Sequence, residues 1–223
     1  MNSSTPCRAR IAIILITFGA LLPGLSGCNM IGFAASVVTG DGTQTQRFKA
    51  EYRGLENKSV AVIVAADEYM LYENPGSQLA ISRAVSKQMA VDMPGIKLAN
   101  PQDVAHFQTE NPYWSTLPNR QILDALKVQR LVYIDLTELS THDPGNSNEW
   151  RGVIVANVSV AEADAADPDN FVYRSLVNVK YPTDRSIGVL EANDQSVRLG
   201  MLKLFGSDVS DLFHDHEKVV PKW

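Results

Sequence analysis

Cysteine is scarce in this chain, and both cysteines lie near its start. The 223 residues contain only Cys7 and Cys28. Cys7 belongs to a predicted leader and Cys28 is the first residue after it, so the rest of the chain has no thiol and no disulfide. This excludes a cysteine nucleophile, an iron–sulfur cluster and a zinc–thiolate site in the folded body, and it leaves stability to an apolar core.

Strong charge of one sign and the common catalytic motifs are also lacking. The formal net charge is −5, and such a mildly acidic chain is a poor match for nucleic acid, whose phosphates favour a cationic surface. The sequence has no nucleophile elbow, no phosphate loop and no paired-histidine zinc motif, so we expect a protein that is not an enzyme and carries no cofactor. With 45% hydrophobic and 20% charged residues, the composition is that of a globular protein.

The one long apolar run lies at the N-terminus. Arg8 and Arg10 precede residues 11–22, which are interrupted only by Thr17 and Gly19. A helix of this length extends about 18 Å, whereas the hydrocarbon core of a bilayer is about 30 Å thick. The cationic start, the short apolar run and the small residues that follow therefore indicate a secretory leader, residues 1–27, rather than a transmembrane helix.

The tetrapeptide Leu25-Ser26-Gly27-Cys28 resembles the lipobox of bacterial lipoproteins. The resemblance implies cleavage before Cys28, attachment of diacylglycerol to its sulfur and acylation of the new amine, for example with palmitate. Two or more acyl chains hold a protein stably on a bilayer, so a membrane surface is the first expected partner. Because Asn29 rather than aspartate follows, the resemblance also implies the outer membrane, facing the periplasm. The alternative is an ordinary secretory leader with an incidental cysteine.

The rest of the chain divides into three predicted parts. Residues 28–56 are rich in glycine, threonine and glutamine and predict a flexible tether. Residues 57–212 predict a single globular domain, and residues 213–223 a loose polar tail.

Periodicity within the domain predicts an α/β (α+β) fold with a single mixed sheet. Residues 60–66 form an apolar, β-branched run typical of a strand buried on both faces, and residues 77–92 have helical spacing with Ser77 as the expected cap. Further strands are expected at residues 96–98, 131–136, 153–163 and 171–181, and further helices after Asn100, after Pro118 and over residues 193–211, where Gly206 is expected to bend or split the helix. The order β-α-β-α-α-β-β-β-α combines parallel crossovers with antiparallel hairpins, so the sheet must be mixed.

This pattern resembles one group of envelope proteins. A lipidated cysteine, a polar tether, a first strand Val-Ala-Val-Ile-Val, alternating helices and a terminal hairpin plus helix are similar to the group that joins the N-terminal domain of TolB, the curli-secretion lipoprotein and the lipoprotein activator of penicillin-binding proteins. The resemblance covers about residues 58–212 and includes no catalytic motif. It implies binding to another envelope protein. It does not extend to a pore, because the connectors are too short for membrane hairpins.

Two loops carry the candidate binding residues. Asp67 and Glu68, a candidate ligand loop, follow the first strand together with Tyr69 and Tyr72, at the strand end where α/β folds often bind ligands. Tyr113 and Trp114 form the most aromatic loop, and such residues either anchor protein interfaces or fill the edge of a core. We take Tyr69, Tyr72, Tyr113 and Trp114 as candidate interface residues.

Two polar clusters have metal-ligand residue types. His214, Asp215, His216 and Glu217 form the densest cluster, but they lie in the predicted loose tail. Asp164, Asp167 and Asp169 lack the spacing of a calcium loop and are typical of an acidic hairpin tip. We therefore expect no metal at either cluster.

Taken together, these patterns predict a membrane-anchored envelope lipoprotein that acts as a non-enzymatic binding or accessory module for another envelope protein. The alternative is a small-molecule or glycan-binding accessory protein of a transporter, and a hydrolase is a weaker third hypothesis because no catalytic set is assembled.

Overall fold

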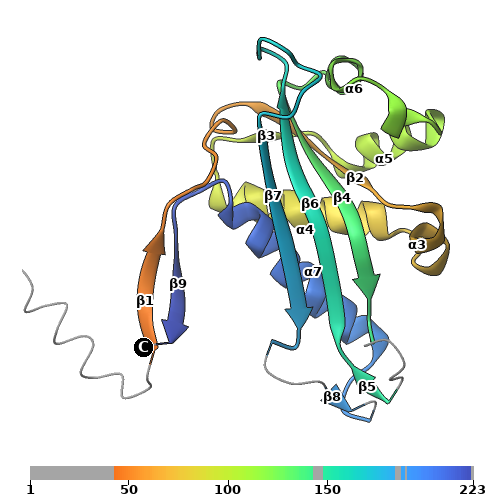
Figure 1. The fold of residues 1–223 in the computed structure, drawn as a ribbon, viewed down its shortest axis with the longest axis vertical. Coiled ribbons are helices and arrows are strands. Elements are labelled where there is room, and N and C mark those ends of the chain that lie inside the picture. Colours follow the sequence, from red (N-terminus) through yellow and green to blue (C-terminus); the bar gives the residue numbers. More distant parts are fainter. Residues whose placement is uncertain (1–42, 143–147, 184–186, 189, 222–223) are drawn as a thin grey trace, which may run out of the picture. The chain divides into compact units, whose positions relative to one another are not determined.

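The computed structural model describes residues 43–142, 148–183, 187–188 and 190–221, so the leader, Cys28 and Asn29 lie outside it (Figure 1). Residues Arg47–Glu217 form one compact unit, and residues 43–46 and 218–221 belong to a second. The strands are β1 (Thr43–Phe48), β2 (Ser59–Ala65), β3 (Lys97–Leu98), β4 (Arg130–Ser140), β5 (Glu149–Trp150), β6 (Gly152–Glu162), β7 (Tyr173–Tyr181), β8 (Ile187–Gly188) and β9 (His216–Pro221). The helices are α3 (Glu68–Glu73), α4 (Ser77–Asp92), α5 (Pro101–Glu110), the 3-10 turn η1 (Trp114–Thr116), α6 (Asn119–Leu126) and α7 (Asp194–Asp211).

The centre of the main unit is a five-stranded mixed sheet, as predicted. Its strand order is β3-β2-β4-β6-β7. β2 runs parallel to β3 and to β4, with Val62 opposite Val132, whereas β6 runs antiparallel to both β4 and β7. The parallel pairs follow the helical crossovers, and the antiparallel pairs follow short connectors.

Helices cover the two faces of the sheet unequally. α4 and α7 lie side by side against one face (Figure 1), and the larger core forms there, including Val62, Ile81, Val132, Val158 and Phe205. α5, η1 and α6 cover part of the other face, over a smaller core that includes Ile63, Val104, Ile122 and Leu131. β2 is therefore buried on both faces, which explains its continuous apolar sequence. On β7, by contrast, Leu176 is 62% exposed.

α7 is one continuous helix that packs closely on α4. It begins with a capping box between Asn193 and Ser196 and contains Gly206 in its interior. A Cβ atom at Gly206 would lie 2.9 Å from the carbonyl oxygen of Ala84. The predicted split at Gly206 is therefore wrong, and the absent side chain instead allows the two helix backbones to approach.

The folded unit extends beyond the boundary predicted on its N-terminal side. Within the predicted tether, residues 43–48 form β1, and Leu55 is fully buried in the larger core. The backbone N–H groups of Glu51 and Tyr52 donate to the carbonyl of Leu212, and Arg130 Nε donates to the carbonyl of Gly54 at 3.0 Å. The composition of this segment predicted a tether. The contacts that hold the segment join residues far apart in sequence, so composition alone does not reveal them.

The C-terminal end is also more ordered than the predicted tail. Phe213 is 1% exposed within the larger core, and residues 216–221 form β9, which pairs with β1 in a two-stranded sheet. The sequence of neither strand predicts a β-strand on its own. Pairing of β1 with β9 gives hydrogen-bond partners to the backbone N–H and C=O groups of both segments.

Two local predictions near the first helix are also corrected. The predicted loop after the first strand contains the short helix α3, and the N-cap of α4 is Gly76, with φ of 79°, rather than Ser77. Glycine tolerates this left-handed conformation without a steric penalty.

Among the described residues, no helix has both the length and the hydropathy needed to cross a membrane.

Candidate functional site

Three segments meet at the carboxyl end of β2. The carbonyl oxygen of Val64 accepts hydrogen bonds from Gln78 Nε2 on α4 and Gln108 Nε2 on α5, both at 2.9 Å. α3 follows β2 directly (Figure 1). These bonds hold the start of α4 and the end of α5 beside the carboxyl end of β2, and α3 begins there because it follows β2 in sequence. The sequence placed its candidate residues at this edge of the sheet.

α3 presents two tyrosines to solvent. The carboxylate of Asp67 caps this helix by accepting a hydrogen bond from the backbone N–H of Met70 at 2.6 Å, and the Met70 side chain is buried. Tyr69 and Tyr72 are 74% and 80% exposed, one helical turn apart. Asp67 therefore stabilises the start of the helix that bears the tyrosines. Glu68 lies exposed in the first turn of the same helix.

The aromatic loop after α5 divides its two rings between surface and core. Tyr113 is 81% exposed, whereas Trp114 is only 6% exposed and lies in the smaller core with its ring centroid 5.8 Å from that of Tyr133. Asn111 Nδ2 caps the end of α5 through the carbonyl of Phe107 at 2.8 Å and sets this turn. The prediction that Trp114 is an interface residue is therefore wrong, because Trp114 begins the 3-10 turn inside the core while Tyr113, just before the turn, is exposed to solvent.

A polar cavity of about 500 Å³ opens beside α3. Asp67 and Tyr69 line it together with Asn74, Glu138, His142 and Arg198, whereas Glu68 is not among its lining residues. Arg198 donates to Asp194 at 2.6 Å and to Asn74 Oδ1 at 2.8 Å, so its guanidinium is fixed in place. Carboxylates, an amide and a guanidinium in one cavity suit a ligand with many hydroxyl groups.

A second hollow of about 420 Å³ lies on the sheet face, and the sequence analysis missed it. Tyr133, Asp135, Asn157, Arg174 and Leu176 are among its lining residues. Burial raises the pKa of the Asp135 carboxyl and that of the Tyr133 hydroxyl, which the charge of Asp135 raises further. Alternate outward positions on three neighbouring strands meet here, and only the register of β4, β6 and β7 shows which of them are adjacent.

The three aspartates of the acidic hairpin tip accept hydrogen bonds from other groups of the chain. Arg130 Nη1 donates to Asp164 Oδ1 at 2.5 Å, and Asp169 accepts from the backbone N–H of Arg120 at 2.9 Å. Asp167 accepts from Asn170 Nδ2 at 2.6 Å. The three carboxylates therefore face different partners rather than one common point.

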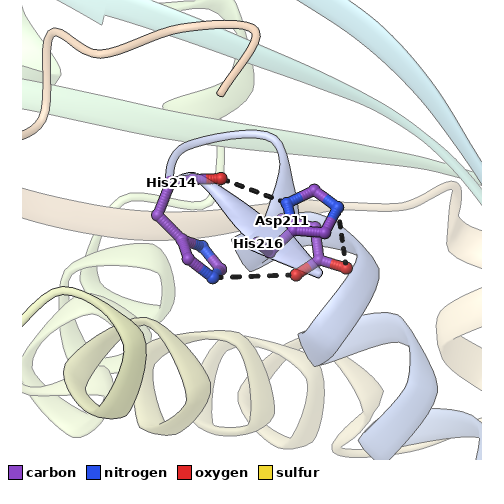
Figure 2. Close-up of side chains that lie close together, drawn as sticks. All are labelled: Asp211, His214 and His216. Carbon is purple, nitrogen blue, oxygen red and sulfur yellow. Dashed lines mark hydrogen bonds and ion pairs between the residues drawn. The ribbon is translucent and has the colours of Figure 1, made fainter. Parts of the chain in front are cut away.

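The C-terminal cluster of ligand-type residues is divided in two. Asp215 pairs with Arg53, and Glu217 pairs with Arg47. The two histidines turn the other way: His214 Nε2 lies 3.9 Å from Asp211 Oδ1, and His216 Nε2 lies 3.7 Å from Asp211 Oδ2 (Figure 2). The sequence analysis overlooked Asp211, since it assigned that residue to the end of a helix and the histidines to a loose tail.

No protein-family model matches this chain, and no curated protein matches it either. Its structure is similar to that of the PelC dodecamer from Paraburkholderia phytofirmans, with a TM-score of 0.43, 8% identity and coverage of 75% of this chain and 97% of that one. It is also similar to the lipoprotein GNA1162 from Neisseria meningitidis, with a TM-score of 0.42, 10% identity and coverage of 69% and 96%. A third similar structure is the hypothetical protein CT253 from Chlamydia trachomatis, with a TM-score of 0.40, 14% identity and coverage of 69% and 96%. At these identities and scores the similarities assign no function to this chain.

Proposed function

We propose that this protein is a lipid-anchored lipoprotein of the bacterial cell envelope that binds another envelope protein without catalysing a reaction. Lipid attachment at Cys28 confines the folded unit to a membrane surface and raises its effective concentration for a partner on that surface. Asn29 after the cysteine favours the periplasmic side of the outer membrane. The lipobox supports the anchor, and the tyrosines at the end of β2 support the binding role.

The observation that carries the binding role is the group of Tyr69, Tyr72 and Tyr113. Each side chain is at least 74% exposed. Helix α3, which bears Tyr69 and Tyr72, follows the carboxyl end of β2 directly, and α5, which precedes Tyr113, is bonded to Val64 near that end through Gln108. Tyrosine is among the residue types that contribute most to protein interfaces, because its ring buries a large area at a low cost in side-chain entropy. We refer to these three residues as the tyrosine edge.

Anchorage is tested by mass spectrometry and fractionation of the full-length protein. We expect an N-terminal Cys28 that carries acyl groups, and we expect Cys28→Ser to move the protein into the soluble fraction. An intact leader, an unmodified N-terminus or a membrane-bound Cys28→Ser variant would contradict the anchor.

Partner binding is tested by placing a photo-crosslinking residue at Tyr113 in the lipidated chain on native membranes. We expect one discrete adduct there and none from the same residue at Val91, which is 69% exposed on α4. Adding Tyr69→Ala and Tyr72→Ala should lower the adduct yield by about tenfold or more, since tyrosines at the energetic centre of an interface contribute about 2 kcal/mol or more. Equal yields at Tyr113 and Val91, or a yield that both alanine variants leave unchanged, would refute the tyrosine edge as an interface.

The cavity beside α3 favours a second candidate function, the binding of a small polar ligand such as a glycan. Its support is the volume of about 500 Å³ and the mixture of charged and amide groups on its wall. Titration of the protein with a panel of soluble glycans tests this function. Glu138→Gln should weaken any binding at this site, and Glu110→Gln, on the exposed side of α5, is the control.

A further inference from the structure

We infer that Asp211, His214 and His216 form a binding site for a divalent transition-metal cation, with Zn²⁺ as the best-fitting probe. Each residue offers one ligand atom, and these atoms all lie within 4.8 Å of one another. Asp211 is the last residue of α7 and His216 is the first residue of β9, so the cation would join the end of the helix to the start of the strand (Figure 2).

The hydrogen bonds of the two rings direct the correct nitrogen atoms toward Asp211. His214 Nδ1 lies 2.9 Å from the carbonyl oxygen of Ser210, and His216 Nδ1 lies 3.1 Å from the carbonyl oxygen of His214. A carbonyl oxygen only accepts, so each Nδ1 carries the proton, and the lone pair of a neutral ring is then on Nε2. Ring nitrogens of metal-binding histidines are commonly fixed by this kind of carbonyl partner.

The distances are close to those of a metal site. Zinc ligands at about 2.0 Å and tetrahedral angles lie about 3.3 Å apart. The two Nε2 atoms lie 3.7 and 3.9 Å from the carboxylate oxygens of Asp211. Binding therefore requires these two pairs to approach by about half an ångström.

The donor types select the class of cation. Two imidazoles and a carboxylate suit zinc, copper, nickel or iron, whereas calcium and magnesium prefer oxygen ligands alone. All three side chains are largely shielded from water, with exposures of 11% for Asp211, 20% for His214 and 14% for His216. This shielding favours a cation bound to the three side chains over a cation surrounded by water. Stacking of the His216 ring on Phe48, with centroids 5.5 Å apart, further holds that ligand in position.

The experiment uses the full-length protein without a histidine tag, stripped of metal with a chelator and then titrated with Zn²⁺. We expect one zinc per chain by calorimetry and, at zinc about 100-fold above the dissociation constant, a rise in melting temperature of about 5–10 °C. Co²⁺ in place of Zn²⁺ should give the visible absorption of a cobalt ion with nitrogen ligands. Ca²⁺ should give neither binding by calorimetry nor a rise in melting temperature.

Variants separate a metal site from a simple ion pair. His214→Ala and His216→Ala should each lower zinc affinity by at least tenfold, and the double variant should lose the zinc-dependent shift. His106→Ala is the matched control, because His106 also faces a carboxylate, Glu110, at 3.1 Å, but is 71% exposed. The quantity compared is the shift caused by zinc in each variant, so a variant that is less stable without metal remains informative. No zinc-dependent shift in the unmodified chain, or an equal shift in the double variant, would overturn the inference.

Discussion

Replacing Arg130 tests how the segment before β2 is held to the sheet. The Arg130 side chain is 6% exposed, and its guanidinium donates to the carbonyl of Gly54 at 3.0 Å and to Asp164 Oδ1 at 2.5 Å. Glu162 lies 3.5 Å from Arg130 Nε and accepts from the Tyr52 hydroxyl. Arg130→Met keeps most of the buried stem but removes every donor of the guanidinium group.

The magnitude follows from the exposure of the two carboxylates. Removing one partner of a fully buried ion pair costs about 3–5 kcal/mol. Here Glu162 is 22% exposed and Asp164 57% exposed, so water compensates in part, and a loss of about 2–3 kcal/mol is expected. For a folded unit of this size, that loss lowers the melting temperature by about 5–10 °C.

The assay is thermal and urea unfolding followed by circular dichroism, with Arg130→Met, Asp164→Asn and the double variant forming a mutant cycle. Arg47→Met is the matched control, because Arg47 also pairs with a glutamate but its side chain is 88% exposed. That control should change the melting temperature by no more than about 1 °C. If Arg130→Met behaves like Arg47→Met, the network does not stabilise the fold and the reasoning fails.

Three further results follow from the same structure. Gly206→Ala should lower the free energy of unfolding by about 1–2 kcal/mol in urea titrations, because overpacking between helices costs more than the roughly 1 kcal/mol gained in helix propensity; an equal or higher stability would contradict the close helix approach. The hydrogen bond from Arg130 lowers the pKa of the Asp164 carboxyl below its ordinary value of 3.8, so this stabilisation is present above that pH and is lost as the pH falls through the folded-state pKa. Melting temperatures measured from pH 7 to pH 3 should therefore fall less steeply for Asp164→Asn than for the unmodified protein. Equal slopes would argue against stabilisation by the Arg130–Asp164 pair. Trp114→Ala should cost about 3–5 kcal/mol of stability, whereas Tyr113→Ala should leave unfolding curves unchanged, and similar losses for both would place Tyr113 in the core.

Elements with strong local patterns could be predicted from the sequence. The apolar run at residues 60–66 predicts a strand buried on both faces, and the structure has β2 there, with helices packed on each side. The helices α4 and α7 end where the sequence placed their last residues. For α4 the signal is Pro94-Gly95, which follows the helix directly. The mixed sheet also follows from local information, because connector length decides between parallel and antiparallel neighbours.

The candidate site could be predicted only in part. The sequence placed Tyr69 and Tyr72 at the end of the first strand, but it did not show that α5, which precedes Tyr113, is bonded to Val64 at that strand through Gln108. Tyr113 and Trp114 have the same residue class and adjacent positions, so no periodic pattern distinguishes the exposed ring from the buried one. The direction of the 3-10 turn after α5 decides between them.

By itself, the sequence determined the periodicity of the sheet and its helices and the absence of cysteine after Cys28, whereas the leader with its lipobox stays a prediction. Local side-chain chemistry is sufficient for each of these. The tertiary structure alone decided that residues 47–56 and 213–217 belong to the main folded unit, and that Asp211 lies beside His214 and His216. These outcomes depend on contacts between segments distant in sequence, or on the direction in which a turn points its side chains, and neither is encoded in the spacing of apolar residues.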